Sequence, residues 1–125
     1  MKMFKKILLC LILSISIFNV ASLDSAHARG SSNSILFTKD KTSSTTRVTL
    51  KSGEKLSIGT FVYSGSVVFT VFKNGKQYQT FAPQKNSFNY KFPNAGPGKY
   101  SLRAYCGYPN ALKTGCHSIF SITAN

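Results

Sequence analysis

The sequence predicts a small all-β domain, an antiparallel β-sandwich of about seven to eight strands, with a small β-barrel as the alternative. Three observations carry this prediction. Short runs rich in Val, Ile, Phe, Tyr and Thr recur along the chain, and turn residues interrupt them about every ten residues. Several runs alternate apolar and polar residues, as half-buried strands do. Beyond the N-terminal segment, no stretch repeats apolar residues at helical spacing.

The N-terminal segment has the pattern of a secretory signal peptide. A basic start over residues 1–6 precedes an apolar stretch over residues 7–20, and Ala26-His27-Ala28 supplies the small-x-small pattern that signal peptidase cleaves. An uncleaved anchor is the alternative, but the apolar stretch is short for a membrane span. We expect cleavage after Ala28 and a secreted or extracellular protein with no transmembrane span after cleavage, retained noncovalently if it stays at the cell surface.

The remainder is long enough for one domain. Residues 1–28 are the predicted signal peptide, residues 29–34 a flexible, polar lead-in, and residues 35–125 the single β-sandwich domain. The expected strands are, in order, residues 35–38, 46–50, 56–62, 67–72, 77–81, 88–92, 100–106 and 117–123.

The first strands are predicted from alternation and from the loops between them. A charged, hydroxyl-rich loop over residues 39–45 follows the first strand. The second strand places Thr46, Val48 and Leu50 on one face. The third, after a turn at residues 52–55, alternates from Leu56 to Val62.

The middle of the chain carries the strongest local signal. Residues 67–72 are apolar on both faces, which is typical of a central strand covered on two sides. Asn74-Gly75 follows, and residues 77–81 return. Asn-Gly suits a type I′ turn, in which both central residues need positive φ, so we expect a hairpin.

The later strands also alternate. Phe88, Tyr90 and Phe92 share one face of their strand, and a turn cluster with two prolines follows over residues 93–98. In the next strand Tyr100 to Cys106 alternate between an inward set and an outward set that includes Arg103 and Tyr105.

One short segment carries a family resemblance. Residues 95–103, Ala-Gly-Pro-Gly-Lys-Tyr-Ser-Leu-Arg, resemble the Gly-x-Tyr-x-Leu turn and strand of bacterial immunoglobulin-like and fibronectin-like domains. The resemblance implies an Ig-like sandwich with Tyr100 at a strand corner. The chain departs from antibody domains because it has no tryptophan. A fold-level resemblance implies no function.

Two cysteines, Cys106 and Cys116, remain after cleavage, because Cys10 lies in the predicted leader. An even pair in an exported chain predicts one disulfide. We expect it to join neighbouring strands and to close a loop over residues 107–115. A redox role for free thiols is the alternative, although the C-x-x-C spacing is absent.

The predicted mature domain is strongly basic. Removing residues 1–28 leaves 13 Lys and Arg against two carboxylates, Asp40 and Glu54, a formal net charge of +11. A small soluble domain typically carries a charge of magnitude about 2–8. The excess predicts an anionic partner: a cell-wall polymer, a lipid surface or an acidic extracellular macromolecule.

Few side chains of the domain can move protons or attack bonds. Asp40 is flanked by lysines and Glu54 precedes one, so each is expected to be a solvated surface charge. A disulfide would remove the thiols from any Cys-His pair with His117. No Gly-x-Ser-x-Gly motif frames a serine, and one histidine with two bridged cysteines does not make a zinc site. The sequence therefore predicts no enzyme, no metal site and no cofactor.

The candidate binding residues combine cations with aromatic and apolar side chains. Lys91 and Arg103 fall on polar strand faces, where we expect them to share one surface with Tyr105. The 107–115 loop presents an aromatic, an apolar and a basic residue, Tyr108, Leu112 and Lys113; the alternative is an ordinary long hairpin connection closed by the disulfide. The eight phenylalanines of the mature domain are expected inside, including Phe69, Phe72, Phe88 and Phe92.

The function that we predict is a secreted cationic, non-catalytic binding module for an anionic envelope or an acidic extracellular partner. One alternative is an antimicrobial or toxin-like effector, against which stands the lack of an amphipathic helix. Another is a self-assembling structural protein, since residues 67–72 are uncharged and rich in β-formers. A protease inhibitor presenting Lys113 is a further alternative.

Overall fold

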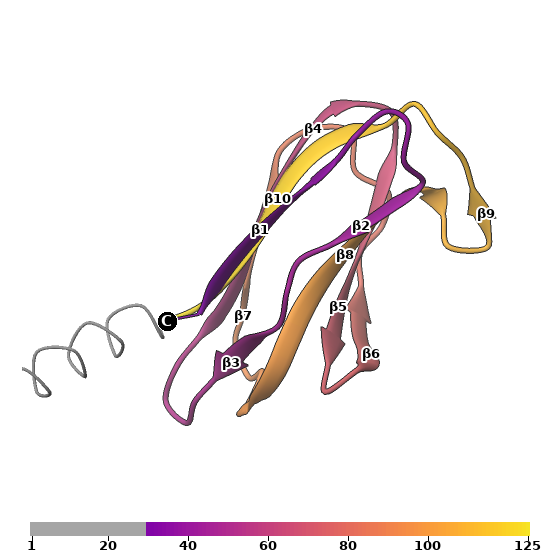
Figure 1. Ribbon diagram of the computed structural model, residues 1–125. Helices are drawn as coiled ribbons and strands as arrows, with labels where there is room; N and C mark the ends of the chain where they lie inside the picture. Colours follow the sequence, from indigo (N-terminus) through magenta and orange to yellow (C-terminus); the bar gives the residue numbers. More distant parts are fainter. Residues whose placement is uncertain (1–29) are drawn as a thin grey trace, which may run out of the picture.

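The computed structural model describes residues 30–125, so the predicted signal peptide and its cleavage site lie outside the described residues. In this part of the chain, ten strands form two antiparallel sheets that pack face to face (Figure 1). The predicted sandwich is therefore confirmed, and the strands do not close into the alternative barrel. No helix among residues 30–125 has the length and apolarity of a membrane span.

The first sheet, sheet A, has four strands and the order β1-β10-β4-β7. Their bounds are Ser31–Leu36 for β1, His117–Ala124 for β10, Leu56–Ser64 for β4 and Phe88–Phe92 for β7. All neighbouring pairs are antiparallel.

The second sheet, sheet B, is built around the longest strand, β8. The path runs β2-β8-β5-β6, and β3 and β9 also pair with β8. The bounds are Thr42–Ser44 for β2, Val48–Leu50 for β3, Val67–Lys73 for β5, Lys76–Thr80 for β6, Gly98–Tyr108 for β8 and Ala111–Leu112 for β9.

Two predictions near the N-terminus are wrong. Residues 29–34 were expected to be a flexible lead-in, but β1 begins at Ser31 and pairs along its whole length with β10. The loop predicted over residues 39–45 contains β2, which pairs with β8. Serine and asparagine, which dominate these two strands, carry little strand signal by themselves, and the partner strands arrive from the far end of the chain, so local pattern missed both pairings.

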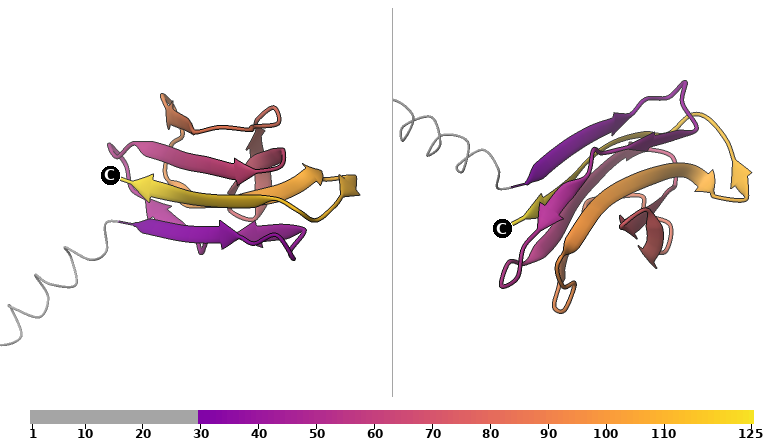
Figure 2. Two further views of the ribbon diagram at one scale, coloured as in Figure 1. Left: turned by 90° about the horizontal axis from the view of Figure 1, so that it is seen from above. Right: turned by 60° about the horizontal axis from the view of Figure 1, so that its bottom comes forward.

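Hydroxyl groups join the two sheets along the edge where β1 and β2 run side by side (Figure 2). Ser34 Oγ lies 2.7 Å from Ser43 Oγ, and Ser32 Oγ lies 2.7 Å from Thr46 Oγ1. The opposite edge is closed by rings instead: Phe81, after β6, contacts Phe88, Tyr90 and Phe92 of β7. The apolar core lies between these edges.

The core contains fewer phenylalanines than predicted. Phe69 and Phe92 are buried as expected, and Phe88 packs against the core. Phe72 instead lies on the outer face of sheet B, because inward and outward residues alternate along β5 and Phe72 occupies an outward position. Phe37 and Phe61 are 50% and 46% exposed. The prediction that all eight face inward is therefore wrong.

Tyr100 occupies the strand corner implied by the resemblance to immunoglobulin-like domains. Its ring is fully buried, and its hydroxyl donates to the carbonyl oxygens of Ala95 and Gly96, the latter at 2.7 Å. Lys73 Nζ also donates to the Ala95 oxygen, at 2.9 Å. The turn before β8 is thus fastened to the core by side-chain donors.

The predicted disulfide joins Cys106 and Cys116, with a Cα–Cα distance of 5.6 Å. The expectation that it joins neighbouring strands of one sheet is wrong. Cys106 lies in β8 of sheet B, and Cys116 directly precedes β10 of sheet A, so the bond links the two sheets at one end. Gly65 (φ 79°) packs against it, because a Cβ there would lie 2.6 Å from Cys116 Sγ.

Candidate functional site

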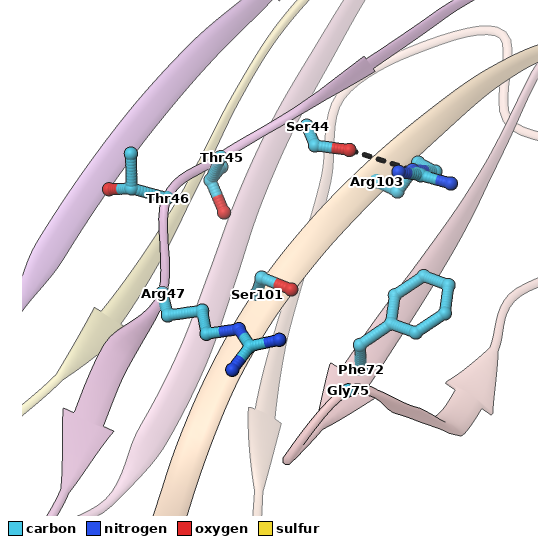
Figure 3. A pocket seen from close by; sticks show the side chains of 8 residues that line it. All are labelled: Ser44, Thr45, Thr46, Arg47, Phe72, Gly75, Ser101 and Arg103. Carbon is cyan, nitrogen blue, oxygen red and sulfur yellow. Dashed lines mark hydrogen bonds between the residues drawn. The ribbon is translucent and has the colours of Figure 1, made fainter.

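A basic groove lies on the outer face of sheet B, across β8 (Figure 3). It is a hollow of about 380 Å³ between the β2–β3 link, β8 and the β5–β6 turn. The side chains and backbone of eight residues line it: Ser44, Thr45, Thr46, Arg47, Phe72, Gly75, Ser101 and Arg103. Two of these are arginines and none is an acid, which makes this basic groove the candidate anion site.

Arg103 projects from the middle of the groove floor. Its register partners are Ser44 of β2 and Thr70 of β5, so it stands on the outer face of the central strand. Its Nε donates to Ser44 Oγ at 2.7 Å, and its guanidinium carbon lies 5.6 Å from the centroid of the Phe72 ring. These contacts orient the guanidinium and leave further N–H groups of the fork for a ligand.

Arg47 reaches the same hollow from the link between β2 and β3 (Figure 3). Its Nη2 atom lies beside Gly75, since a Cβ built there would be only 3.4 Å from that nitrogen. The side chain therefore extends toward the β5–β6 turn. Two guanidinium groups from separate segments line one groove, and guanidinium suits bidentate binding of phosphate or carboxylate.

The β5–β6 turn forms the far wall of the basic groove. Asn74 (φ 53°) and Gly75 (φ 84°) both have positive φ, which confirms the predicted Asn-Gly hairpin. Asn74 also ties the turn to β8: its N–H donates to the Lys99 oxygen at 2.7 Å, and its Oδ1 accepts from the Lys99 N–H at 3.0 Å. The groove wall is therefore held by backbone and side-chain hydrogen bonds.

The predicted surface of Lys91, Arg103 and Tyr105 is not formed. Lys91 projects from β7 in sheet A, whereas Arg103 projects from β8 in sheet B, so the two cations lie on opposite faces of the sandwich. Tyr105 is only 8% exposed and lines no part of the basic groove. Alternation within one strand shows which residues share a face, but the sheet to which each strand belongs is set by long-range pairing.

The predicted 107–115 loop is a short hairpin that projects beyond the two sheets (Figure 1). Tyr108 pairs with Ala111, and Gly107 pairs with Leu112. Directly opposed residues share a face, so Tyr108 and Leu112 point to opposite sides of the hairpin. Tyr108 is 57% exposed, and Lys113 is exposed at the hairpin's end. These three residues therefore do not form one patch.

Sequence reasoning found Arg103 but missed Arg47 and Phe72 as its companions. Arg47 follows a hydroxyl-rich segment with no motif around it, and Phe72 resembles a core residue. The one available signal was the alternation along the predicted strand, which places Val48 on the inward face and Arg47 on the outward face. Within the described residues, no group of three His, Cys, Asp or Glu side chains converges to hold a metal ion.

Two solved bacterial structures align with this chain. The pre-peptidase C-terminal domain of collagenase from Bacillus anthracis aligns with a TM-score of 0.52 at 18% identity, over 78% of this chain and 89% of that chain. Aeromonas hydrophila PliG, a periplasmic inhibitor of g-type lysozyme, aligns with a TM-score of 0.40 at 18% identity, over 77% of this chain and 89% of that chain. No family model and no curated protein matches the sequence. The first of these similarities supports the sandwich fold.

Proposed function

We propose that the protein is an extracytoplasmic, non-catalytic binding module that holds an anionic polymer in the basic groove. The observation that carries the proposal is that Arg47 and Arg103 line one groove whose lining includes no carboxylate. The signal-peptide pattern and the disulfide support a location outside the cytoplasm. A cell-wall polymer, a lipid surface or an acidic macromolecule would each supply the anions.

The shape of the groove favours a polymer segment over a small anion. The hollow lies across β8, and its two guanidinium groups come from different elements, Arg47 from the β2–β3 link and Arg103 from β8. Ser44 and Ser101 add hydroxyl groups to the lining, and hydroxyl groups can hydrogen-bond to phosphate or carboxylate oxygens. The high net charge of the domain adds long-range attraction that raises the rate of encounter.

The test is binding of the exported protein to isolated bacterial envelopes and to polyphosphate at low, physiological and high salt. We expect binding that falls steeply with salt, because exposed charges are screened over about 8 Å at physiological ionic strength. Arg47→Gln with Arg103→Gln should weaken binding at least tenfold, since each charge-assisted hydrogen bond contributes about 1.5–3 kcal/mol.

The matched control is Lys55→Gln with Lys85→Gln, which removes the same charge from exposed positions outside the groove. The control should lose less than threefold in affinity, an effect of net charge alone. Equal losses in the two double variants would contradict the groove and leave only nonspecific attraction. Leakage of anionic vesicles at the binding concentration would favour the antimicrobial function instead.

A further inference from the structure

The outer face of sheet A differs from the rest of this basic domain because it is almost uncharged. Among the outward positions of its four strands, Lys91 is the one Lys, Arg, Asp or Glu. The other outward positions carry hydroxyl, amide, aromatic or aliphatic side chains, apart from His117 and Gly59. A neutral face on a domain with a net charge of +11 suits a neutral ligand rather than another anion.

One end of this face is an apolar platform. Ile35, Ile119 and Phe61 lie in one cross-strand row over β1, β10 and β4, and all three side chains are exposed. Beside them the rings of Phe37 and Tyr63 flank His117, at centroid distances of 6.5 and 4.7 Å. Tyr63 also contacts Phe61 at 4.6 Å. The rings hold one another in place, which lowers the entropy lost when a ligand binds.

The next cross-strand row is a polar trough. Asn33, Ser121, Gly59 and Asn89 are register partners across all four strands. Two shallow hollows, of about 360 and 310 Å³, meet at Gly59 and Ser121. Gly59 has no side chain, which leaves the floor of the trough open. A Cβ at this position would lie 3.2 Å from Asn89 Oδ1 and 3.4 Å from Ser121 Oγ. With strands about 4.8 Å apart, the trough spans about 14 Å.

We propose that this face binds a neutral saccharide chain. A sugar ring has one face of C–H groups, which would pack on Phe61 and Ile119. Its hydroxyls would meet the hydroxyl and amide groups of the trough, with Ser121 and Asn89 on either side of Gly59. The length of the trough suits a short oligosaccharide. The proposal is independent of the basic groove, which lies on the opposite sheet.

The chemistry of the face distinguishes this ligand from two others. A nucleic acid or acidic polymer requires several cations, and this face offers Lys91 alone. A protein partner or a second copy would bury an apolar patch with a polar rim around it. Here the apolar row borders an open polar trough on one side. A sugar ring has both an apolar C–H face and polar hydroxyl groups, so it matches the two neighbouring surfaces.

The experiment measures binding of the exported protein to insoluble cellulose, chitin and starch, and to their soluble hexasaccharides by calorimetry. We expect at least one to bind with little dependence on salt. Gly59→Gln fills the trough from an outward strand position, and Phe61→Ser removes the platform, so each should lower affinity at least tenfold. Circular dichroism establishes that both variants remain folded.

Two controls separate this proposal from the basic groove. Tyr108→Ser removes an equally exposed ring elsewhere, and the Arg47→Gln, Arg103→Gln variant removes the anion site; both should keep saccharide binding. Absence of binding to every saccharide, or binding unaffected by Gly59→Gln and Phe61→Ser, would overturn the proposal. A dimer in sedimentation that Phe61→Ser dissociates would also overturn it, in favour of self-association.

Discussion

At the residue scale, Tyr100 fastens the turn before β8 to the core. The resemblance to immunoglobulin-like domains implied its place at a strand corner, and the structure shows its hydroxyl donating to the carbonyl oxygens of Ala95 and Gly96. Ala95 is itself buried, so its carbonyl needs donors from the protein. Lys73 Nζ supplies the second donor to that oxygen.

Replacing Tyr100 with Phe should lower the free energy of unfolding by about 1–2 kcal/mol, because a buried hydrogen bond is lost while the ring remains. For a domain of this size, the melting temperature should fall by about 4–10 °C. Thermal unfolding followed by circular dichroism measures the change. Tyr108→Phe, at an exposed position, is the control and should not change it. An unchanged melting temperature for Tyr100→Phe would mean that the corner contributes no stability.

At the element scale, the β5–β6 hairpin depends on one asparagine for two separate tasks. Asn74 adopts positive φ, which few side chains tolerate, and its Oδ1 accepts a hydrogen bond from the Lys99 N–H at 3.0 Å. The first task follows from the local sequence, and the Asn-Gly pair predicted it. The second depends on the start of β8, which lies 25 residues further along the chain.

Two substitutions at Asn74 test whether these tasks stabilise the domain. Asn74→Asp keeps the acceptor and tolerates positive φ, so stability should change by less than about 0.5 kcal/mol. Asn74→Ala loses both and should cost about 2 kcal/mol. Chemical denaturation measures the difference. If the two variants were equally stable, neither the turn geometry nor the bond to Lys99 would matter.

At the scale of the whole molecule, the two sheets divide the surface chemistry between them. The outer face of sheet B carries the basic groove, and the outer face of sheet A is nearly neutral. The disulfide between Cys106 and Cys116 links these sheets at one end, while hydroxyl pairs along one edge join β1 to β2 and to Thr46 after it. The relative position of the two faces therefore depends on covalent and polar links as well as on the core.

Reducing the disulfide should lower the free energy of unfolding by about 2–3 kcal/mol, because the unfolded chain regains the freedom of the closed loop. The melting temperature should fall by about 10–20 °C, measured with and without reductant. The Cys106→Ala, Cys116→Ala variant should fall at least as far, since it also removes buried sulfur atoms. This variant has no disulfide to reduce, so its melting temperature with and without reductant controls for other effects of the reagent. Equal melting temperatures for reduced and oxidised protein would contradict a stabilising link.

The all-β class, most strands, the Asn-Gly hairpin and the disulfide pair were predictable from sequence patterns, whereas the corner position of Tyr100 was implied by the resemblance to immunoglobulin-like domains. The pattern-based predictions depend on short-range physics or on composition: alternation with period two, turn geometry, or two cysteines in a chain with a signal-peptide pattern. For the candidate site, the sequence identified the excess of positive charge and Arg103. It also placed Lys91 and Tyr105 beside Arg103, which the structure contradicts.

The sheet to which each strand belongs could not be predicted from local sequence and is known from the tertiary structure. That assignment brings Arg47 to Arg103, separates Lys91 from both, and aligns Gly59 with Ser121 of β10. β1 and β2 have almost no strand signal of their own, and their partners lie far along the chain. Long-range pairing depends on burial and register across the whole domain, so a local pattern can assign a residue to a strand face but not to a shared surface.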